Sequence, residues 1–277
     1  MCADKSRVIV VVPLYTTKLS ADDVMSLQRT IAVLGKHPLA IICPEGLDLS
    51  PLDNLLHPGT PAVERFPPTY FKGVEGYNQL MLSTQFYSRF AAYEYLLICQ
   101  TDVFVFEDKL EYWCGRGYDY IGAPWIGSPR NAFNKLMFGL TNLLRRRKRS
   151  EEQLFKVGNG GFSLRKVAMM QRIVAEQRTD IEHALANPNR HRHHIEDVYF
   201  SLLARKKIPE MRIPDYVEAV DFCIDRKPAL AISINGGRLP FACHGFNKPK
   251  VRGFWAPILA NIASQRTTGI AIEASSR

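Results

Sequence analysis

Short apolar runs alternate along this chain with segments in which apolar side chains recur every three or four residues. Residues 7–15 form a β-branched run that ends near Pro13, since proline cannot donate to a central strand ladder. Residues 39–43 form a second run. Between the two, apolar positions from 24 to 34 follow helical spacing, and Ser20 is placed to cap the helix. This strand–helix–strand order predicts a parallel, right-handed unit of nucleotide-binding type.

The residues after the first run argue against two large classes of nucleotide-binding protein. The Gly-rich fingerprint of dinucleotide dehydrogenases is absent there. A Walker-type Gly-Lys-Ser/Thr loop is also missing from the sequence.

A near-continuous apolar stretch at residues 93–106 predicts a central strand covered on both faces. The strand runs from Tyr95 to Cys99, Asp102 interrupts the pattern where it should end, and the run resumes at 103–106. In open α/β sheets, ligands bind outside the carboxyl ends of strands, so a carboxylate there is suited to a cation or a phosphate. Asp102 could equally cap a turn between two strands.

The other patterns complete a coarse map of the chain. They predict loops with a short strand over 44–76, a helix over 77–92, a strand over 118–125, a helix over roughly 165–177, and short strands and turns over 208–240, including a run at 229–234. Residues after 265 are small and polar, so we expect the end of the chain to fray.

Residues 133–149 combine a helical apolar pattern with five consecutive basic residues, Arg145 to Arg149. A basic amphipathic helix is typical of a segment that binds an anionic membrane surface, where each cation contributes on the order of 1 kcal/mol. The alternative is a helix that faces the core and ends in a solvated basic segment. The membrane interpretation is favoured, because such a basic run has no packing purpose.

Three further stretches carry candidate chemistry. Gly158, Gly160 and Gly161 surround Asn159, which lets the backbone approach a ligand closely. The pair Glu196-Asp197 opens a predicted helix, where acids are also ordinary partners of the helix dipole. His244 follows an apolar strand end with lysines close behind, and a buried core histidine is the alternative.

Composition limits the cellular setting and the class of partner. The chain has 277 residues, 46% hydrophobic and 23% charged, with 36 basic against 27 acidic residues and a net charge of +9. A basic protein favours phosphate-bearing partners. The six cysteines are scattered without a Cys-x-x-Cys pair, and neither a signal peptide nor an apolar run of about 20 residues is present. These features predict a cytoplasmic protein, peripheral on the inner face of the membrane if the basic segment binds lipid.

Taken in order, these stretches resemble a GT-A glycosyltransferase, with the closest overall likeness to bacterial glycosyltransferase-like proteins. Gln100-Thr101-Asp102 corresponds to the Asp-x-Asp motif of that superfamily, with its first acid replaced. Residues 160–162 and 196–198 resemble the Gly-Gly and Glu-Asp-Val motifs of fringe-like inverting enzymes. Residues 243–249, Cys-His-Gly-Phe-Asn-Lys-Pro, are similar to the C-terminal histidine motif of glycogenin-like retaining enzymes.

The resemblance implies an α/β, Rossmann-like GT-A fold with a mostly parallel central sheet flanked by helices. We expect one domain over 1–265, with a nucleotide-sugar half at 7–106, an acceptor and catalytic half at 107–265, and a flexible tail at 266–277.

The same resemblance implies roles for individual residues. Asp102 and His244 are the expected ligands of Mn²⁺ or Mg²⁺. Oxygen-rich ligation with one imidazole suits manganese better than zinc. Asp197 is the expected catalytic base, with Glu196 capping the helix or contacting the acceptor. Trp125 and Phe162 are expected on the acceptor side. The expected nucleotide-sugar contacts are Pro13, Leu14, Tyr15, Asn78, Gln100, Thr101, Asp102, Asn159, Gly160, Gly161 and Lys248.

The implied reaction moves a sugar from a nucleotide diphosphate donor, of which a UDP-sugar is favoured, to a glycan or lipid-linked acceptor. Inversion at the anomeric carbon is expected, and a retaining transferase is the rival within this class. The rival from another class is a non-catalytic nucleotide- or nucleic-acid-binding protein. The aromatic residues lie in apolar strands instead of interleaving with the basic runs, so we expect no nucleic-acid partner.

Overall fold

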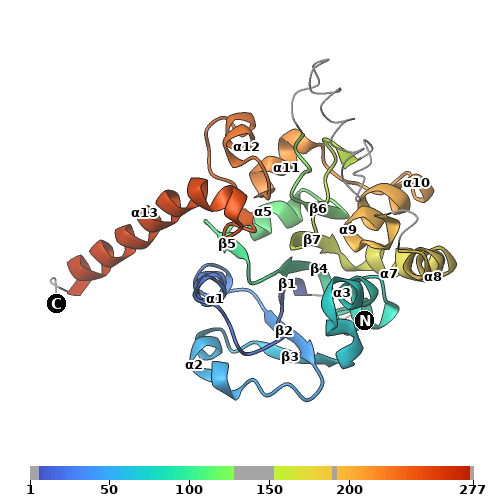
Figure 1. Cartoon of the computed structure of the whole chain (residues 1–277), viewed down its shortest axis with the longest axis horizontal. Helices are drawn as coiled ribbons and strands as arrows, with labels where there is room; N and C mark the ends of the chain where they lie inside the picture. Colours follow the sequence, from blue (N-terminus) through green and yellow to red (C-terminus); the bar gives the residue numbers. More distant parts are fainter. Residues whose placement is uncertain (1–5, 128–152, 189–191, 275–277) are drawn as a thin grey trace.

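The computed structural model describes residues 6–127, 153–188 and 192–274, and its centre is a six-stranded sheet with the strand order β3-β2-β1-β4-β7-β6 (Figure 1). The strands are β1 (Ser6–Pro13), β2 (Leu39–Pro44), β3 (Ala62–Phe66), β4 (Tyr93–Cys99), β6 (Tyr120–Gly122) and β7 (Phe162–Lys166). β1, β2, β3 and β4 are parallel, and β7 runs antiparallel between β4 and β6. The prediction of a mostly parallel central sheet flanked by helices is confirmed.

The first strand–helix–strand unit forms as the sequence predicts. Helix α1 (Ala21–Leu34) begins after Ser20, whose side chain accepts the backbone N–H of Asp23 while Asp23 accepts that of Ser20. This capping box satisfies two donors that the helix itself leaves open. β1 and β2 then pair in parallel, with Val10 beside Leu39.

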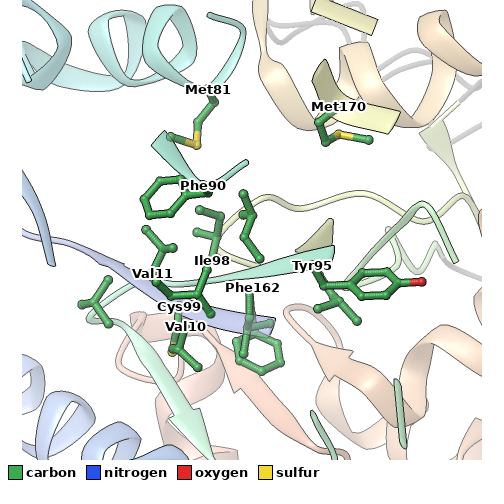
Figure 2. Close-up of a cluster of buried hydrophobic side chains, with 14 of the residues drawn as sticks. Val10, Val11, Met81, Phe90, Tyr95, Ile98, Cys99, Phe162 and Met170 are labelled. Carbon is green, nitrogen blue, oxygen red and sulfur yellow. The ribbon is translucent and has the colours of Figure 1, made fainter. Parts of the chain in front are cut away.

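Helices cover both sides of the central sheet (Figure 1). α1 and α2 (Asp53–Leu56) lie on one side with α5 (Leu110–Gly115), and α3 (Gly73–Met81), α7 (Val167–Glu176) and α8 (Arg178–Ala186) lie on the other. The apolar faces of these helices bury β1 and β4, so the main core lies around the two central strands. Figure 2 shows this packing, with Val10 and Phe162 on one face of the sheet and Val11 and Ile98 on the other.

A second, three-stranded sheet has the order β5-β9-β8. Its strands are β5 (Val103–Val105), β8 (Cys223–Ile224) and β9 (Ala242–His244). β8 and β9 are parallel, and β5 is antiparallel to β9. The apolar run at 93–106 is therefore shared by two sheets, because the chain leaves the central sheet after Cys99 and enters the second at Val103.

Three local predictions differ from the structure. The helix predicted over 77–92 is two helices, α3 and α4 (Thr84–Arg89), because Ser83 accepts the N–H of Phe86 and starts a new helix. The helix predicted from 165 begins at Val167, after β7. The segment 208–240, predicted as short strands and turns, contains two helices, α11 (Tyr216–Phe222), which Asp215 caps, and α12 (Pro228–Ile234). The apolar run at 229–234 belongs to α12, which Pro228 starts at its first position.

The C-terminal helix α13 (Pro249–Ala274) extends away from the sheets (Figure 1). Its first turns are anchored by Val251, Trp255 and Leu259, which are buried against the second sheet's apolar cluster. The helix includes much of the segment predicted to fray, and the flexibility of that segment stays a prediction. None of the helices in the described ranges combines the length and apolarity needed to cross a membrane. The basic segment 133–149 lies outside the described residues.

Candidate active site

The topology brings three titratable side chains to one edge of the second sheet. Asp102 directly precedes β5, and Val103 lies opposite His244, the last residue of β9. Asp225 directly follows β8, which is parallel to β9. Parallel strands end at the same edge and an antiparallel neighbour begins there. Asp102, His244 and Asp225 therefore meet beside the carboxyl end of β4, although they are far apart in the sequence.

The His244 imidazole lies between two carboxylates. Its Nε2 is 3.1 Å from Oδ1 of Asp102, and its Nδ1 is 3.1 Å from Oδ1 of Asp225. The other oxygen of Asp102 lies 3.2 Å from Nζ of Lys248, directly before α13. The His244 ring is almost entirely removed from water, at 7% exposure, whereas the side chains of Asp102 and Lys248 are 25% and 51% exposed.

The charges of these groups are mutually dependent. Burial alone would lower the pKa of His244, but the carboxylates of Asp102 and Asp225 raise it to about 9. Burial alone would raise the pKa of Asp102, but His244 and then Lys248 hold that pKa well below its usual range. Asp102 is therefore a carboxylate at neutral pH, with positive charge held on both of its oxygens.

The glycine run before β7 allows close contact with this site. The Gly161 carbonyl accepts the N–H of Gln100, which joins the run to the end of β4. A Cβ at Gly161 would lie 2.3 Å from Nε2 of His244 and 2.8 Å from Oε1 of Gln100. A Cβ at Gly160 would lie 1.6 Å from Oε1 of Glu196. A larger residue at either position would clash with these buried side chains, so both positions require glycine.

Gly161→Ala is therefore expected to destabilise the protein by about 1–3 kcal/mol, because the added methyl group must displace buried side chains. Gly253→Ala is the matched control, since a Cβ there meets nothing within 4 Å. In a helix, that change should raise stability by up to about 1 kcal/mol. Urea unfolding of both variants measures the difference, and equal stability of the two would contradict the close packing at Gly161.

Glu196 is buried in an ion pair. Its carboxylate lies 2.9 Å from Nη2 of Arg165, and both side chains are almost fully enclosed. The Arg165 guanidinium also donates to the Tyr87 hydroxyl, at 3.0 Å, and lies over the rings of Tyr120 and Phe200. Burial raises the pKa of Glu196 to about 7, although the positive charge of Arg165 acts in the opposite direction. Glu196 is thus enclosed in the protein, where it cannot contact an acceptor directly.

Asp197, the next residue, faces a cavity of ≈ 80 Å³. The cavity combines a carboxylate, a guanidinium and an indole with apolar walls. Its lining residues are Trp125, Ile126, Gln153, Leu154, Asn159, Ile195, Asp197, Val198 and Arg226. An aromatic surface beside a few polar groups is a feature of small-molecule sites, but this cavity is smaller than the roughly 300–1,000 Å³ usual for them, so it can enclose only part of a ligand.

Several of the other predicted contacts also reach this region. Pro13 and Leu14 are buried at the end of β1, and Tyr15 beyond them is 40% exposed with its ring edge-on to Phe71. Partial burial, followed by the charges of Glu196 and Asp102, raises the pKa of Tyr15.

Other predicted contacts are engaged within the protein. The Thr101 hydroxyl donates to Asp23, at 2.9 Å. The Asn78 side-chain oxygen accepts the backbone N–H of Glu196, at 3.0 Å, while its Nδ2 is buried and makes no hydrogen bond. Phe162 is fully buried and packs on Phe222 and Phe241, so it supports the core and does not line the cavity.

Sequence reasoning missed Arg165, Asp225 and Arg226. A signal was present for Asp225, since it is an acid directly after the apolar pair Cys223-Ile224, as Asp102 is after its strand. The strand β8 has only two residues, too few for a periodic pattern. Arg165 gave no such signal, because nothing local distinguishes a buried arginine from one on the open face of a strand.

Asp102 and His244 fit a divalent cation in their donor types and in their surroundings. Nε2 of His244 is buried and makes no hydrogen bond despite its closeness to Asp102, while Asp225 contacts the opposite ring nitrogen. A carboxylate behind a histidine is the usual outer partner of a metal-binding imidazole. Within the described ranges, no three His, Cys, Asp or Glu side chains are arranged to hold one metal ion together. The protein would therefore supply two ligands, and a bound diphosphate and water the others.

The fold and site together define a mixed α/β protein with a polar cavity beside the carboxyl end of its central strand. A family model matches residues 60–244, described as a protein of unknown function (DUF5672). The chain belongs to this family, and the match includes Asp102, Asp197, Asp225 and His244.

The comparison with solved structures adds a distant structural likeness. A comparison of this chain with curated protein sequences found no match. Among solved structures, the chain is similar to core-mannan synthase A from Aspergillus fumigatus in its Mn/GDP form. The TM-score is 0.44 and the identity is 9%, over 79% of this chain and 73% of that chain.

Proposed function

We propose that this protein is a glycosyltransferase that moves a sugar from a nucleotide diphosphate donor to a hydroxyl group of a glycan or lipid-linked acceptor. The observation that carries the proposal is the pairing of Asp102 with His244 at the end of β4, next to a cavity that Asp197 lines. A phosphate-binding centre and a carboxylate in a neighbouring cavity are the two parts that such a transfer needs. We further propose a UDP-sugar as donor and inversion as the stereochemical outcome.

The donor side must neutralise a leaving diphosphate. Asp102 and His244 would hold Mn²⁺ or Mg²⁺, which supplies Lewis-acid stabilisation of that charge when bound. Lys248 contacts Asp102 from the start of α13 and is half-exposed, so its ammonium group can turn toward a phosphate. Gly160 and Gly161 have no side chain, which allows Glu196 and His244 to pack directly against the backbone beside this site.

The acceptor side must remove a proton from a hydroxyl group. Asp197 faces the cavity, whereas its neighbour Glu196 is enclosed with Arg165. Only Asp197 of this pair can therefore meet an acceptor hydroxyl and take its proton as general base. The indole of Trp125 lines the same cavity and offers an apolar face to a sugar ring.

A panel of nucleotide sugars tests the proposal directly. Thermal unfolding is followed with each nucleotide sugar, with and without Mn²⁺, because a ligand that binds only the native state raises its melting temperature. We expect a UDP-sugar with Mn²⁺ to give the largest shift. Release of the nucleoside diphosphate, and NMR of the anomeric proton in the product, then report turnover and stereochemistry. No shift and no diphosphate release with any member of the panel would reject the proposal.

Asp102→Asn is expected to weaken Mn²⁺ binding and UDP binding together, because the amide removes a negative oxygen from the centre that both share. Calorimetry with Mn²⁺, with UDP and with the two combined measures each affinity. Asp108→Asn is a suitable control, since Asp108 pairs with Lys36 and His37 at another place. Unchanged, metal-independent UDP binding in Asp102→Asn would remove Asp102 from the site.

A further inference from the structure

Asp225 joins the two halves of the proposed site through its two oxygens. Oδ1 lies 3.1 Å from Nδ1 of His244, and Oδ2 accepts a hydrogen bond from Nε of Arg226, at 3.0 Å. Asp225 is 8% exposed, so water cannot easily replace either partner. His244 belongs to the centre with Asp102, and Arg226 lines the cavity with Asp197. One carboxylate therefore contacts a residue of each half.

The contact to His244 determines which ring nitrogen carries the proton. Nδ1 makes a hydrogen bond with Asp225, whereas Nε2 makes none. A carboxylate accepts hydrogen bonds and has none to donate, so Nδ1 presents N–H to Asp225. In the neutral ring, Nε2 then has its lone pair directed toward Asp102. This is the tautomer that a histidine needs to bind a cation through Nε2.

The contact to Arg226 holds a guanidinium at the wall of the cavity. Because Nε donates to Asp225, the planar group is fixed along one edge. The Arg226 side chain is one-third exposed, and it lines the cavity that also contains Asp197. A fixed cation in the same cavity as a catalytic carboxylate can orient a substrate oxygen beside that carboxylate.

We propose that Asp225 is a positioning residue that holds His244 in its cation-binding tautomer and Arg226 against the acceptor cavity. This role deepens the proposed glycosyltransferase function and rests on it. Asp225 touches neither substrate nor cation; it acts through its two partners.

Asp225→Asn is the sharpest variant, because it keeps the size of the side chain and changes only its hydrogen bonding. An amide has one acceptor oxygen and one donor nitrogen, whereas His244 Nδ1–H and Arg226 Nε–H both need an acceptor. The variant can therefore satisfy only one of them. If the amide nitrogen faces the ring, His244 must change its tautomer and present Nε2–H toward Asp102. If it faces Arg226, the guanidinium loses its anchor.

Two measurements on the full chain test the proposal. Nitrogen-15 NMR of labelled histidines, with the His244 signals assigned from a His244→Gln variant, reports the tautomer without any ligand. Calorimetry with Mn²⁺ alone, and with UDP in its presence, reports binding. We expect the wild type to show Nδ1–H above about pH 9, where the ring is neutral. Asp225→Asn should show a changed His244 signal there, with Mn²⁺ affinity lowered about 10- to 100-fold, the usual effect of losing an outer partner.

Asp221→Asn is the matched control, since Asp221 lies four residues earlier and pairs with Lys109, outside the cavity lining. It should bind Mn²⁺ like the wild type. Asp225→Glu restores a carboxylate and should recover part of the lost affinity. In a His244→Ala background, Asp225→Asn should cause no further loss of Mn²⁺ affinity, because the residue through which it acts is gone. Thermal unfolding confirms that each variant is folded.

The contrary results are distinct. An unchanged His244 signal together with wild-type Mn²⁺ affinity in Asp225→Asn would overturn the positioning role. The role would also fail if Asp225→Asn caused the same loss with and without His244. If the wild type binds neither Mn²⁺ nor UDP, the proposed function fails, and the His244 signals in the wild type and in Asp225→Asn still decide whether Asp225 orients the ring.

Discussion

Asp197→Asn is expected to fold, to bind UDP and Mn²⁺ like the wild type, and to transfer sugar roughly 10²–10⁴-fold more slowly. The loss follows from removing a general base, because an amide cannot take the proton of an acceptor hydroxyl. Binding should survive because Asp197 lines the acceptor cavity, whereas the proposed donor centre is formed by Asp102 and His244. Steady-state turnover with a UDP-sugar, set beside calorimetry with UDP and Mn²⁺, measures the two effects separately.

The competing explanation for Asp197 is an acid at a helix start, since α9 (Glu196–Val198) begins at its neighbour. Such an acid contributes about 0.3–1 kcal/mol to stability and little to rate. Asp180→Asn supplies the control, because Asp180 lies in the first turn of α8 and pairs with Lys207 at the surface. It should lose stability only slightly and retain turnover. Near-normal turnover in Asp197→Asn, or a product of retained configuration from the wild type, would show the base assignment to be wrong.

Arg165→Met is expected to destabilise the protein by about 3–5 kcal/mol at neutral pH, because it leaves the Glu196 carboxylate buried without its partner. Arg165 is fully buried and Glu196 is 3% exposed, so water cannot solvate the remaining charge. Urea unfolding of the variant measures the loss. The double variant Arg165→Met/Glu196→Gln should recover most of it, since it removes both charges and keeps similar volumes.

The loss of stability in Arg165→Met should also depend on pH, and the ionisation of Glu196 determines whether the loss grows or shrinks as the pH rises. Burial raises the pKa of Glu196 in the folded protein from 4.5 to about 7. A raised pKa means that this group's stabilising contribution is complete below about pH 4.5 and is lost as the pH rises through about 7. Without Arg165, the pKa should rise further, so the loss should be smaller at pH 5 than at pH 8. An equal loss at both values would indicate that Glu196 stays neutral throughout.

The predictions that succeeded from sequence concern features with local causes. The apolar runs around β1, β2 and β4 have few polar interruptions, and Ser20 carries its capping partner three residues away, so these elements could be predicted. Asp102 could be placed because the end of a buried strand is itself a local pattern. The run at 229–234 was misjudged because a strand and a helix share the same short apolar pattern, and Pro228 decided between them.

The tertiary structure decided which side chains share a site. Asp225 joins His244 only because β8 and β9 end at the same edge, and Arg165 meets Glu196 only because the fold brings the end of β7 to the start of α9. The adjacent acids Glu196 and Asp197 illustrate the same point. Glu196 forms a buried ion pair with Arg165, whereas Asp197 lines the cavity. Burial and pairing depend on elements distant along the chain, whereas spacing and capping depend on neighbours. For this reason the sequence determined the first sheet unit and the candidate acids, and the packing of strands and helices assigned their partners.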